Sequence, residues 1–191
     1  MKSLLAGALD GVDGFLRDDE AQLLYDLAQS VPAGQTIVEI GSYRGRSTIA
    51  LALGAPEGVL VYAIDPHDAH EAGGHRFDMA DNAIFMANVV RAGVGHKIRV
   101  VNLPSSLGAH RWEGWRNVGL LWIDGAHDYE AVKQDVDLWS WYLVPGGKLV
   151  LHDSTGAWEG PTRAANELKF NDGWTEYLGV GYTRVFRKET P

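Results

Sequence analysis

The stretch Val38-Glu39-Ile40-Gly41-Ser42-Tyr43-Arg44-Gly45-Arg46-Ser47 decides the fold. It grows out of a β-branched run at residues 36–40 and leads into an apolar segment at 46–53, which Gly54 and Pro56 close. β-Branched residues favour strands, whereas Gly and Pro end helices. The stretch therefore predicts a strand, a glycine turn and a helix. Glycines in such a turn let a ligand approach the backbone, and the helix N-terminus offers free N–H groups.

The same alternation continues in both directions. An amphipathic helix is predicted at 17–31, inside a helical lead-in over 1–33. Further strands are predicted at 59–64, 98–101, 118–123 and 148–151, and further helices at 77–92, 105–110, 129–143 and 161–170. The strands are nearly continuous apolar runs, which is typical of a parallel sheet covered on both faces.

The C-terminal part departs from this alternation. Two strand-like runs at 174–178 and 182–186 are joined by Gly179-Val180-Gly181, with no room for a helix between them. They predict an antiparallel hairpin. The expected fold is thus an α/β sheet, mostly parallel, in a single domain over residues 1–191. The Gly- and His-rich stretch at 67–75 is expected to form a mobile loop.

Composition narrows the function classes. The 191 residues are 46% hydrophobic and 22% charged, which is typical of a folded domain. The net charge of −8 would repel a phosphate backbone, so no nucleic-acid partner is expected. Without cysteine, a metal ion would need oxygen and nitrogen ligands. No segment approaches the roughly 18 apolar residues of a membrane helix, and residues 1–9 do not resemble a signal peptide. We therefore expect no membrane partner and a cytoplasmic location.

An acidic residue follows the second predicted strand. Asp65 lies 24 residues beyond Gly41, close to the interval at which a carboxylate meets a ribose in nucleoside-binding α/β sheets. The alternative is an Asp that turns the chain before Pro66. The glycine spacing lacks the middle glycine of the dinucleotide fingerprint, which argues against a pyrophosphate ligand.

Besides Asp65, a set of polar residues follows the fourth and fifth predicted strands. Asp124 and His127 come after the former, and His152 and Asp153 after the latter. Ligands of open α/β sheets lie at the carboxyl ends of strands, and this set suits Mg²⁺, Mn²⁺ or acid–base chemistry. The alternative roles are helix caps, a hydrogen-bonded buried histidine and a loop-fixing aspartate. Trp158, just beyond, is either a core residue or a wall of a substrate pocket.

In order and spacing, these motifs resemble the class I S-adenosylmethionine-dependent methyltransferases, and within them the small branch of sugar O-methyltransferases and cephalosporin-hydroxylase-like proteins. The resemblance covers residues 20–186. It rests on the glycine stretch, Ile64-Asp65-Pro66, the segment 123–129 with Val132 and Asp135, and the segment 143–147 leading to His152 and Asp153. It implies a Rossmann-like, doubly wound, seven-stranded sheet whose last strand is antiparallel, in agreement with the predicted hairpin.

The resemblance also implies roles for individual residues. The methionine part of S-adenosylmethionine would be surrounded by Glu39, Gly41, Ser42 and Gly45. Asp65 would hold the ribose and Ser105 the adenine. Metal-dependent relatives place ligands at Asp124 and Asp153, with His152 as a third ligand here, and Asp124 would also lie at the cofactor. His127 would be the general base. The departures are His152, where sugar-modifying relatives often have a carboxylate, and Ser154, where catechol-type enzymes have an amide.

The leading hypothesis is an S-adenosylmethionine-dependent O-methyltransferase, assisted by Mg²⁺ or Mn²⁺, acting on a hydroxyl of a sugar or small natural product. Two alternatives stay open: a cofactor-binding module without turnover, and an NAD-type oxidoreductase, against which the missing glycine counts. The expected partner is a small-molecule hydroxyl acceptor, and a homodimer is left open.

Overall fold

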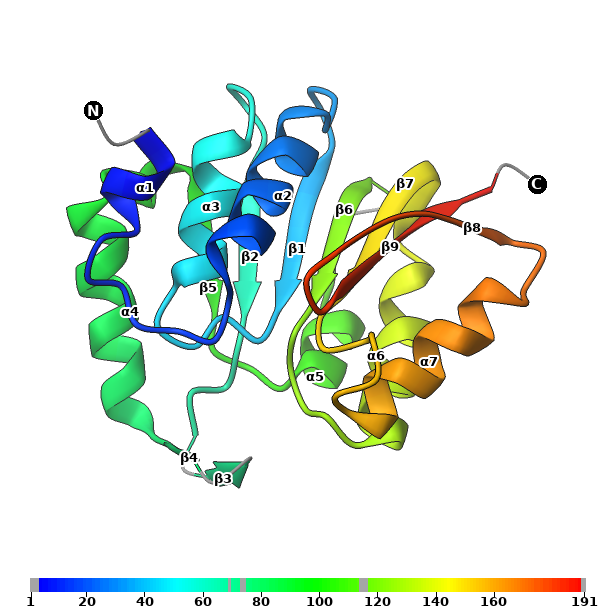
Figure 1. Ribbon diagram of the computed structural model, residues 1–191. Coiled ribbons are helices and arrows are strands. Elements are labelled where there is room, and N and C mark those ends of the chain that lie inside the picture. Colours follow the sequence, from blue (N-terminus) through cyan, green and yellow to red (C-terminus); the bar gives the residue numbers. More distant parts are fainter. Residues whose placement is uncertain (1–3, 69, 73–74, 114–116, 190–191) are drawn as a thin grey trace.

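The computed structural model describes residues 4–68, 70–72, 75–113 and 117–189. Its centre is a seven-stranded sheet with the strand order β5-β2-β1-β6-β7-β9-β8 (Figure 1). Five strands run parallel: β1 (Thr36–Ile40), β2 (Val61–Ile64), β5 (Ile98–Val101), β6 (Val118–Ile123) and β7 (Leu143–Leu151). The hairpin of β8 (Trp174–Val180) and β9 (Thr183–Lys188) joins β7 in antiparallel pairing. The predicted fold class is confirmed.

Helices cover both faces of the sheet (Figure 1). One layer contains α1 (Leu4–Ala8), α2 (Asp18–Gln29), α3 (Arg46–Gly54) and α4 (Met79–Arg91). The other contains α5 (Ser105–His110), α6 (Tyr129–Ser140) and α7 (Glu159–Lys169). A short 3₁₀ turn, Gly95–Lys97, precedes β5. Among the described residues, none of the helices has the length and apolar character that crossing a membrane requires.

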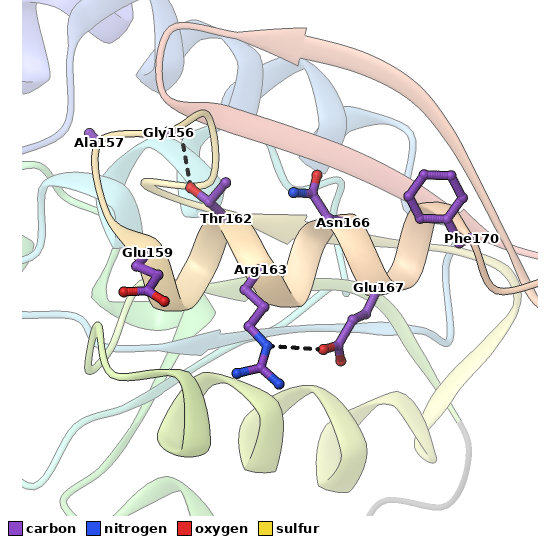
Figure 2. Close-up of a pocket in the computed structure, with 8 residues that line it drawn as sticks. All are labelled: Gly156, Ala157, Glu159, Thr162, Arg163, Asn166, Glu167 and Phe170. Atoms are coloured by element: carbon purple, nitrogen blue, oxygen red, sulfur yellow. Dashed lines mark hydrogen bonds and ion pairs between the residues drawn. The ribbon is translucent and has the colours of Figure 1, made fainter.

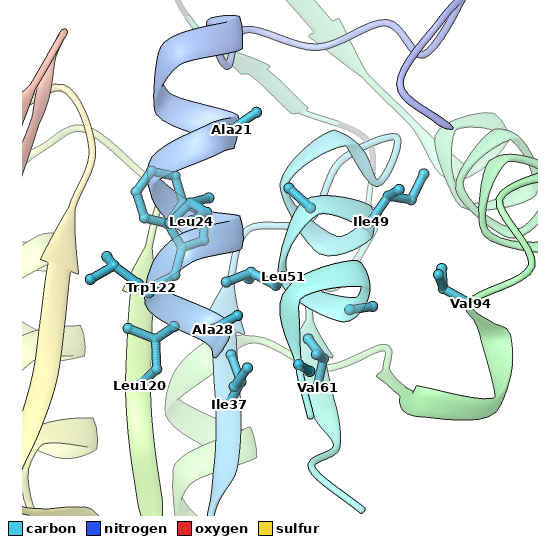
Figure 3. Packing of buried hydrophobic residues seen from close by; sticks show 14 of the residues in the cluster. Ala21, Leu24, Ala28, Ile37, Ile49, Leu51, Val61, Val94, Leu120 and Trp122 are labelled. Carbon is cyan, nitrogen blue, oxygen red and sulfur yellow. The ribbon is translucent and has the colours of Figure 1, made fainter. Parts of the chain in front are cut away.

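The hydrophobic core has two parts, one on each face of the sheet, because side chains alternate between the faces along each strand. Leu120 and Trp122 of β6 pack with α2 and α3 (Figure 3), whereas Leu121 and Ile123 face the other layer. Successive side chains of a strand point to opposite faces. Val150 of β7 packs on the α2 side of the sheet. His152 comes two residues later, so the alternation of the strand places it on the same side.

Several predicted boundaries were wrong by a few residues, with local causes. The helix predicted from Phe77 begins at Met79, because Asp78 caps it: the Asp78 carboxylate accepts the N–H of Ala80, while Asp81 accepts the N–H of Asp78. Phe77 belongs to β4 instead. The strand predicted from residue 59 begins at Val61, and the helix predicted to reach residue 143 ends at Ser140.

Three glycine-containing segments form strands where turns or loops are predicted. Gly179 and Val180, predicted to join the hairpin strands, belong to β8 and pair with Arg184 and Thr183. Residues 144–147 interrupt the register of β7, which passes from Val118↔Leu143 to Leu120↔Lys148, so the Pro-Gly-Gly sequence forms an irregular part of the strand. Within 67–75, β3 (His70–Ala72) pairs antiparallel with β4 (His75–Phe77). The remaining predicted loop positions 69, 73 and 74 lie outside the described residues.

Candidate active site

Backbone strain gathers at the carboxyl ends of the strands. Within the described ranges, three non-glycine residues have positive φ: Tyr43 at 44°, His67 at 47° and Asp153 at 52°. They follow β1, β2 and β7. A left-handed backbone is costly for residues with a side chain, and such residues concentrate at functional sites. This edge of the sheet, where the sequence places both polar groups, is therefore the candidate site.

Two glycines of the loop after β1 are required by close approach. Gly41 has a φ of 82°, and a Cβ there would lie 2.2 Å from the carbonyl oxygen of Asp124. Gly45 has a φ of 89°, and its Cβ would lie 3.1 Å from the ring of Phe85. The Gly41 backbone thus lies directly against the end of β6, which brings the two predicted polar groups into one site.

Asp65 closes the glycine loop. One carboxylate oxygen accepts the N–H groups of Ser42 and Tyr43, both at 2.9 Å, and the other accepts the N–H of His67 at 2.8 Å. The alternative role of Asp65, fixing the turn, is thus present. Its side chain remains 15% exposed, so the ribose contact stays a prediction.

Ser42 offers an unpaired hydroxyl in the same loop. Its side-chain oxygen is buried and has no hydrogen-bond partner among the described residues. A buried hydroxyl without a partner is costly, and a bound ligand can supply the missing hydrogen bond. The position fits the predicted contact with the methionine part of the cofactor.

Two other predicted cofactor residues have protein partners. Glu39 is fully buried, and its two carboxyl oxygens accept the hydroxyls of Ser47 and Thr48. Burial raises the pKa of Glu39 to about 8. Ser105 donates to Asp135, whose pKa burial raises to about 6. Glu39 thus joins β1 to the start of α3, Ser105 joins α5 to α6, and the cofactor contacts of both residues stay predictions.

The residues after β6 and β7 form one cluster. Asp124 Oδ1 lies 2.9 Å from His152 Nδ1, and Asp153 Oδ2 lies 3.5 Å from the same nitrogen. The same oxygen, Asp153 Oδ2, is 3.0 Å from His127 Nε2, and this nitrogen has no aligned hydrogen-bond partner among the described residues. The ring of Trp158 stacks on His127, with centroids 4.5 Å apart and an interplanar angle of 16°.

Sequence reasoning missed a member of this cluster. Glu20 of α2 is fully buried, and its Oε2 lies 3.2 Å from His152 Nε2. Its other oxygen accepts the N–H of Tyr182 at 2.6 Å. The signal was present in the helix, because Leu23, Leu24 and Leu27 lie three, four and seven residues after Glu20, on the same buried stripe. A carboxylate on an apolar stripe needs a buried partner.

The cluster fixes the charges of its members. Burial disfavours the charged ring of His152, but the charge and hydrogen bond of Asp124, together with the hydrogen bond of Glu20, outweigh it and raise the pKa of His152 to about 11. Burial also opposes ionisation of Glu20, but hydrogen bonds from His152 and from backbone N–H groups hold the pKa of Glu20 below its usual value. The cluster is therefore a charged network in which His152 is the buried cation.

A family model described as a methyltransferase domain matches residues 38–154, more than half of the chain. The chain belongs to this methyltransferase family. The matched region runs from the glycine loop to the end of β7, and so contains both polar groups of the site.

Solved structures of other proteins, two of them described as O-methyltransferases, share the fold. An O-methyltransferase from Bacillus cereus, in complex with SAH, is 17% identical with a TM-score of 0.73, over 100% of this chain and 92% of that chain. TomG from Streptomyces achromogenes, an O-methyltransferase involved in tomaymycin synthesis and solved with SAM, is 18% identical with a TM-score of 0.69, over 100% and 91%. A protein from Corynebacterium glutamicum is 17% identical with a TM-score of 0.76, over 100% and 92%.

The donor set of this methyltransferase does not fit the predicted metal ion. Ligand atoms of Asp124, His152 and Asp153 do lie within 4.8 Å of one another. However, both ring nitrogens of His152 already face carboxylates. The cavity lined by Asp124, His127 and His152 measures about 10 Å³, which is room for about one water, whereas Mg²⁺ usually keeps several. The predicted role of His152 as a ligand is not supported.

A larger hollow of about 860 Å³ lies along α7 of the methyltransferase (Figure 2). Its lining comes from α7 and the loop before it, and an ion pair joins Arg163 and Glu167 within it. None of the predicted site residues lines it. The helix itself adjoins the site at its start, because a Cβ on Gly160 would lie 2.2 Å from the carbonyl oxygen of His127.

Proposed function

We propose that this methyltransferase transfers the methyl group of S-adenosylmethionine to a hydroxyl oxygen of a small molecule. The observation that carries the proposal is the contact of Gly41 with the Asp124 carbonyl, because it sets the glycine loop beside the segment that bears His127. A methyl donor on the loop and a base at the acceptor would then face the same point. The similar structures solved with SAH and SAM, both described as O-methyltransferases, support the cofactor and the acceptor class.

The glycine loop and Asp65 would hold the cofactor. The unpartnered hydroxyl of Ser42 can bind the polar groups of its methionine part. Asp65 already accepts three N–H groups, but a carboxylate has about four lone-pair sites, so it retains capacity for one ribose hydroxyl. When bound, S-adenosylmethionine supplies a methyl group that departs from sulfur and leaves the bonding electron pair there.

His127 would remove the acceptor proton. His127 Nε2 lies 3.0 Å from Asp153 Oδ2 without the alignment of a hydrogen bond. A carboxylate that close would favour a proton on Nε2 over a bare lone pair, which would leave Nδ1 as the basic atom. The stacked ring of Trp158 holds the imidazole plane. The proton passes from the hydroxyl to Nδ1, and the oxygen electron pair forms the new O–C bond. Positioning and deprotonation thus both come from side chains of this chain.

The acceptor class is a sugar or small natural product with an accessible hydroxyl. Trp158 is 39% exposed beside His127 and would form one wall of its site. Of the predicted metal site, only the carboxylates of Asp124 and Asp153 suit Mg²⁺, and no step of the proposal needs the ion. A cytoplasmic location and the absence of a nucleic-acid partner remain expectations from composition.

Titration calorimetry with S-adenosylhomocysteine tests the cofactor site. Asp65→Ala should weaken binding at least tenfold, or about 1.4 kcal/mol, because it removes hydrogen bonds to a charged group. Asp65→Asn is the matched control, since its amide oxygen still accepts the loop N–H groups. Its affinity for S-adenosylhomocysteine should lie between that of the wild type and that of Asp65→Ala. No heat of binding by the wild type would overturn the proposal.

Turnover tests the base. S-Adenosylhomocysteine production is measured across a panel of sugars, phenols and other hydroxyl compounds. His127→Ala should lower the rate of any active pair by roughly 10² to 10⁴ with nearly unchanged cofactor affinity. If affinity falls in proportion to rate, His127 is a binding residue. Cofactor binding without turnover of any compound would make the chain a binding module.

A further inference from the structure

We propose that His152 takes the place of a divalent cation among the carboxylates of Asp124, Asp153 and Glu20, so that this methyltransferase binds no metal ion at its active site. The proposal deepens the proposed function, and it rests on that function only for its catalytic consequence. Metal binding itself is a property of the chain that is measured without a substrate.

The first argument is the pairing of the ring. Asp124 lies 2.9 Å from Nδ1 and Glu20 lies 3.2 Å from Nε2, so the two nitrogens face carboxylates on opposite sides. An ionised carboxylate only accepts hydrogen bonds, and satisfying both therefore requires an N–H on each nitrogen. A ring with two N–H groups has no lone pair left for a metal.

The second argument is the burial of Glu20. This carboxylate is fully buried, and its other partners are the backbone N–H groups of Arg17 and Tyr182 and the hydroxyl of Thr183. The guanidinium of Arg17 pairs with Asp19 instead. A buried charge needs a charged partner, and the ring of His152 is the cation that the structure gives to Glu20.

The third argument is space and surroundings. The cavity beside Asp124 and His152 measures about 10 Å³, too small for an ion that keeps its waters. The ring of Trp122 also contacts His152, with centroids 5.3 Å apart and planes tilted by 51°, so a further part of its surroundings offers no metal ligand. Ligand atoms of Asp124, His152 and Asp153 lie within 4.8 Å of one another, so a metal ion held by the two aspartates would lie beside the charged imidazole and meet like-charge repulsion.

The consequence is a site that carries its own positive charge. A metal in such a site would neutralise the carboxylates near the reacting groups. Here His152 supplies that neutralisation from within the fold, and Glu20 on α2 keeps it in place. The proton of the acceptor then depends on the base His127 rather than on metal coordination.

The test measures Mn²⁺ binding to the full chain by calorimetry and by electron paramagnetic resonance, without cofactor or acceptor. The wild type should bind no stoichiometric Mn²⁺ at millimolar concentration. His152→Asn should gain Mn²⁺ affinity at least tenfold, because the three carboxylates lose their cation. His110→Asn, the same change at an exposed histidine, is the control and should leave Mn²⁺ binding unchanged.

One-to-one binding by the wild type that is lost in Asp124→Asn would overturn the proposal. A folded His152→Asn protein whose Mn²⁺ affinity is no higher than that of the wild type would also overturn it. If that variant does not fold, nitrogen-15 NMR of the wild-type histidines decides: a His152 ring with two protonated nitrogens at neutral pH supports the proposal, and one bare nitrogen refutes it. Failure of methyl transfer with any acceptor would leave these readouts unaffected, so the two proposals fail separately.

Discussion

Two glutamates, one on each side of the site, are both fully buried but are held in opposite charge states. Glu39 on β1 meets the hydroxyls of Ser47 and Thr48, and burial raises its pKa to about 8. Glu20 on α2 meets the ring of His152 and backbone N–H groups, which hold its pKa below the usual value. Two side chains that are both hidden from solvent are thus a neutral acid in one place and a carboxylate in the other.

The difference lies in what the partners can do. A hydroxyl donates or accepts, so it satisfies a protonated carboxyl as well as an ionised one. A backbone N–H only donates, and a doubly protonated imidazole does the same with a full charge, so both require the ionised form. The identity of the donors thus contributes to the difference in charge, together with the deeper burial of Glu39 and the nearby carboxylates of Asp124 and Asp65, which raise the pKa of Glu39.

The largest effect is expected at Glu20. Glu20→Gln should lower the free energy of unfolding by about 3–5 kcal/mol, because it leaves the charge of His152 buried with one partner fewer. Urea denaturation at pH 7 measures it. The double variant with His152→Asn should recover part of the loss, and a single variant as stable as the wild type would show that Glu20 and His152 are not an ion pair.

An intermediate effect, visible as a change with pH, is expected at Glu39. Its folded pKa of about 8 exceeds the usual 4.5, so the folded state retains a proton that the unfolded state loses. This contribution to stability is complete below pH 4.5 and declines as pH rises to 8, by up to about 1.4 kcal/mol per unit.

Glu39→Gln tests this directly, because the amide cannot ionise. Unfolding free energies at pH 5.5 and 7.5 should show a smaller decline with pH in the variant than in the wild type. Equal declines would mean that Glu39 is ionised in the folded protein at neutral pH, and the contrast with Glu20 would disappear.

The smallest effect should come from the hydroxyls on Glu39. Ser47→Ala removes one neutral donor from a neutral acid and should cost about 0.5–1.5 kcal/mol at pH 7. Thr48→Val, which keeps the side-chain shape, is the companion variant and should cost a similar amount. A loss of 1.5–3 kcal/mol, the range for bonds to charged groups, would instead indicate an ionised Glu39.

The two regions also differ in how far the sequence predicts them. The glycine loop is local: a strand, Gly41, Gly45 and a helix follow one another as predicted. The neighbours of the two glycines, the Asp124 backbone and the Phe85 ring, lie far along the chain and were not predicted. The repeated order of strand and helix predicts a parallel sheet. Neighbouring strand ends of that sheet bring together Asp124, His127, His152 and Asp153.

Glu20 could not be assigned in that way. It lies 132 residues before His152 in the chain, and no local pattern says which buried group a carboxylate on α2 will meet. The irregular segment of β7 is similar, because its Pro-Gly-Gly sequence has the composition of a turn, although Leu143 before it and Lys148 after it both pair with β6. The exact ends of helices and strands, and the contacts between residues far apart in the chain, depend on tertiary structure. The hydrophobic periodicity of the sequence does not encode it.

The bond between Glu20 and the Tyr182 N–H has a consequence for biosynthesis. The residues that it joins are separated by 162 positions, so α2 leaves the ribosome long before the hairpin of β8 and β9 exists. Until then Glu20 lacks one of the donors that satisfy it, and the helix cannot dock in its final state. Domains fold largely as units during synthesis. In this chain the cluster around His152 is completed only after the hairpin of β8 and β9 has been made.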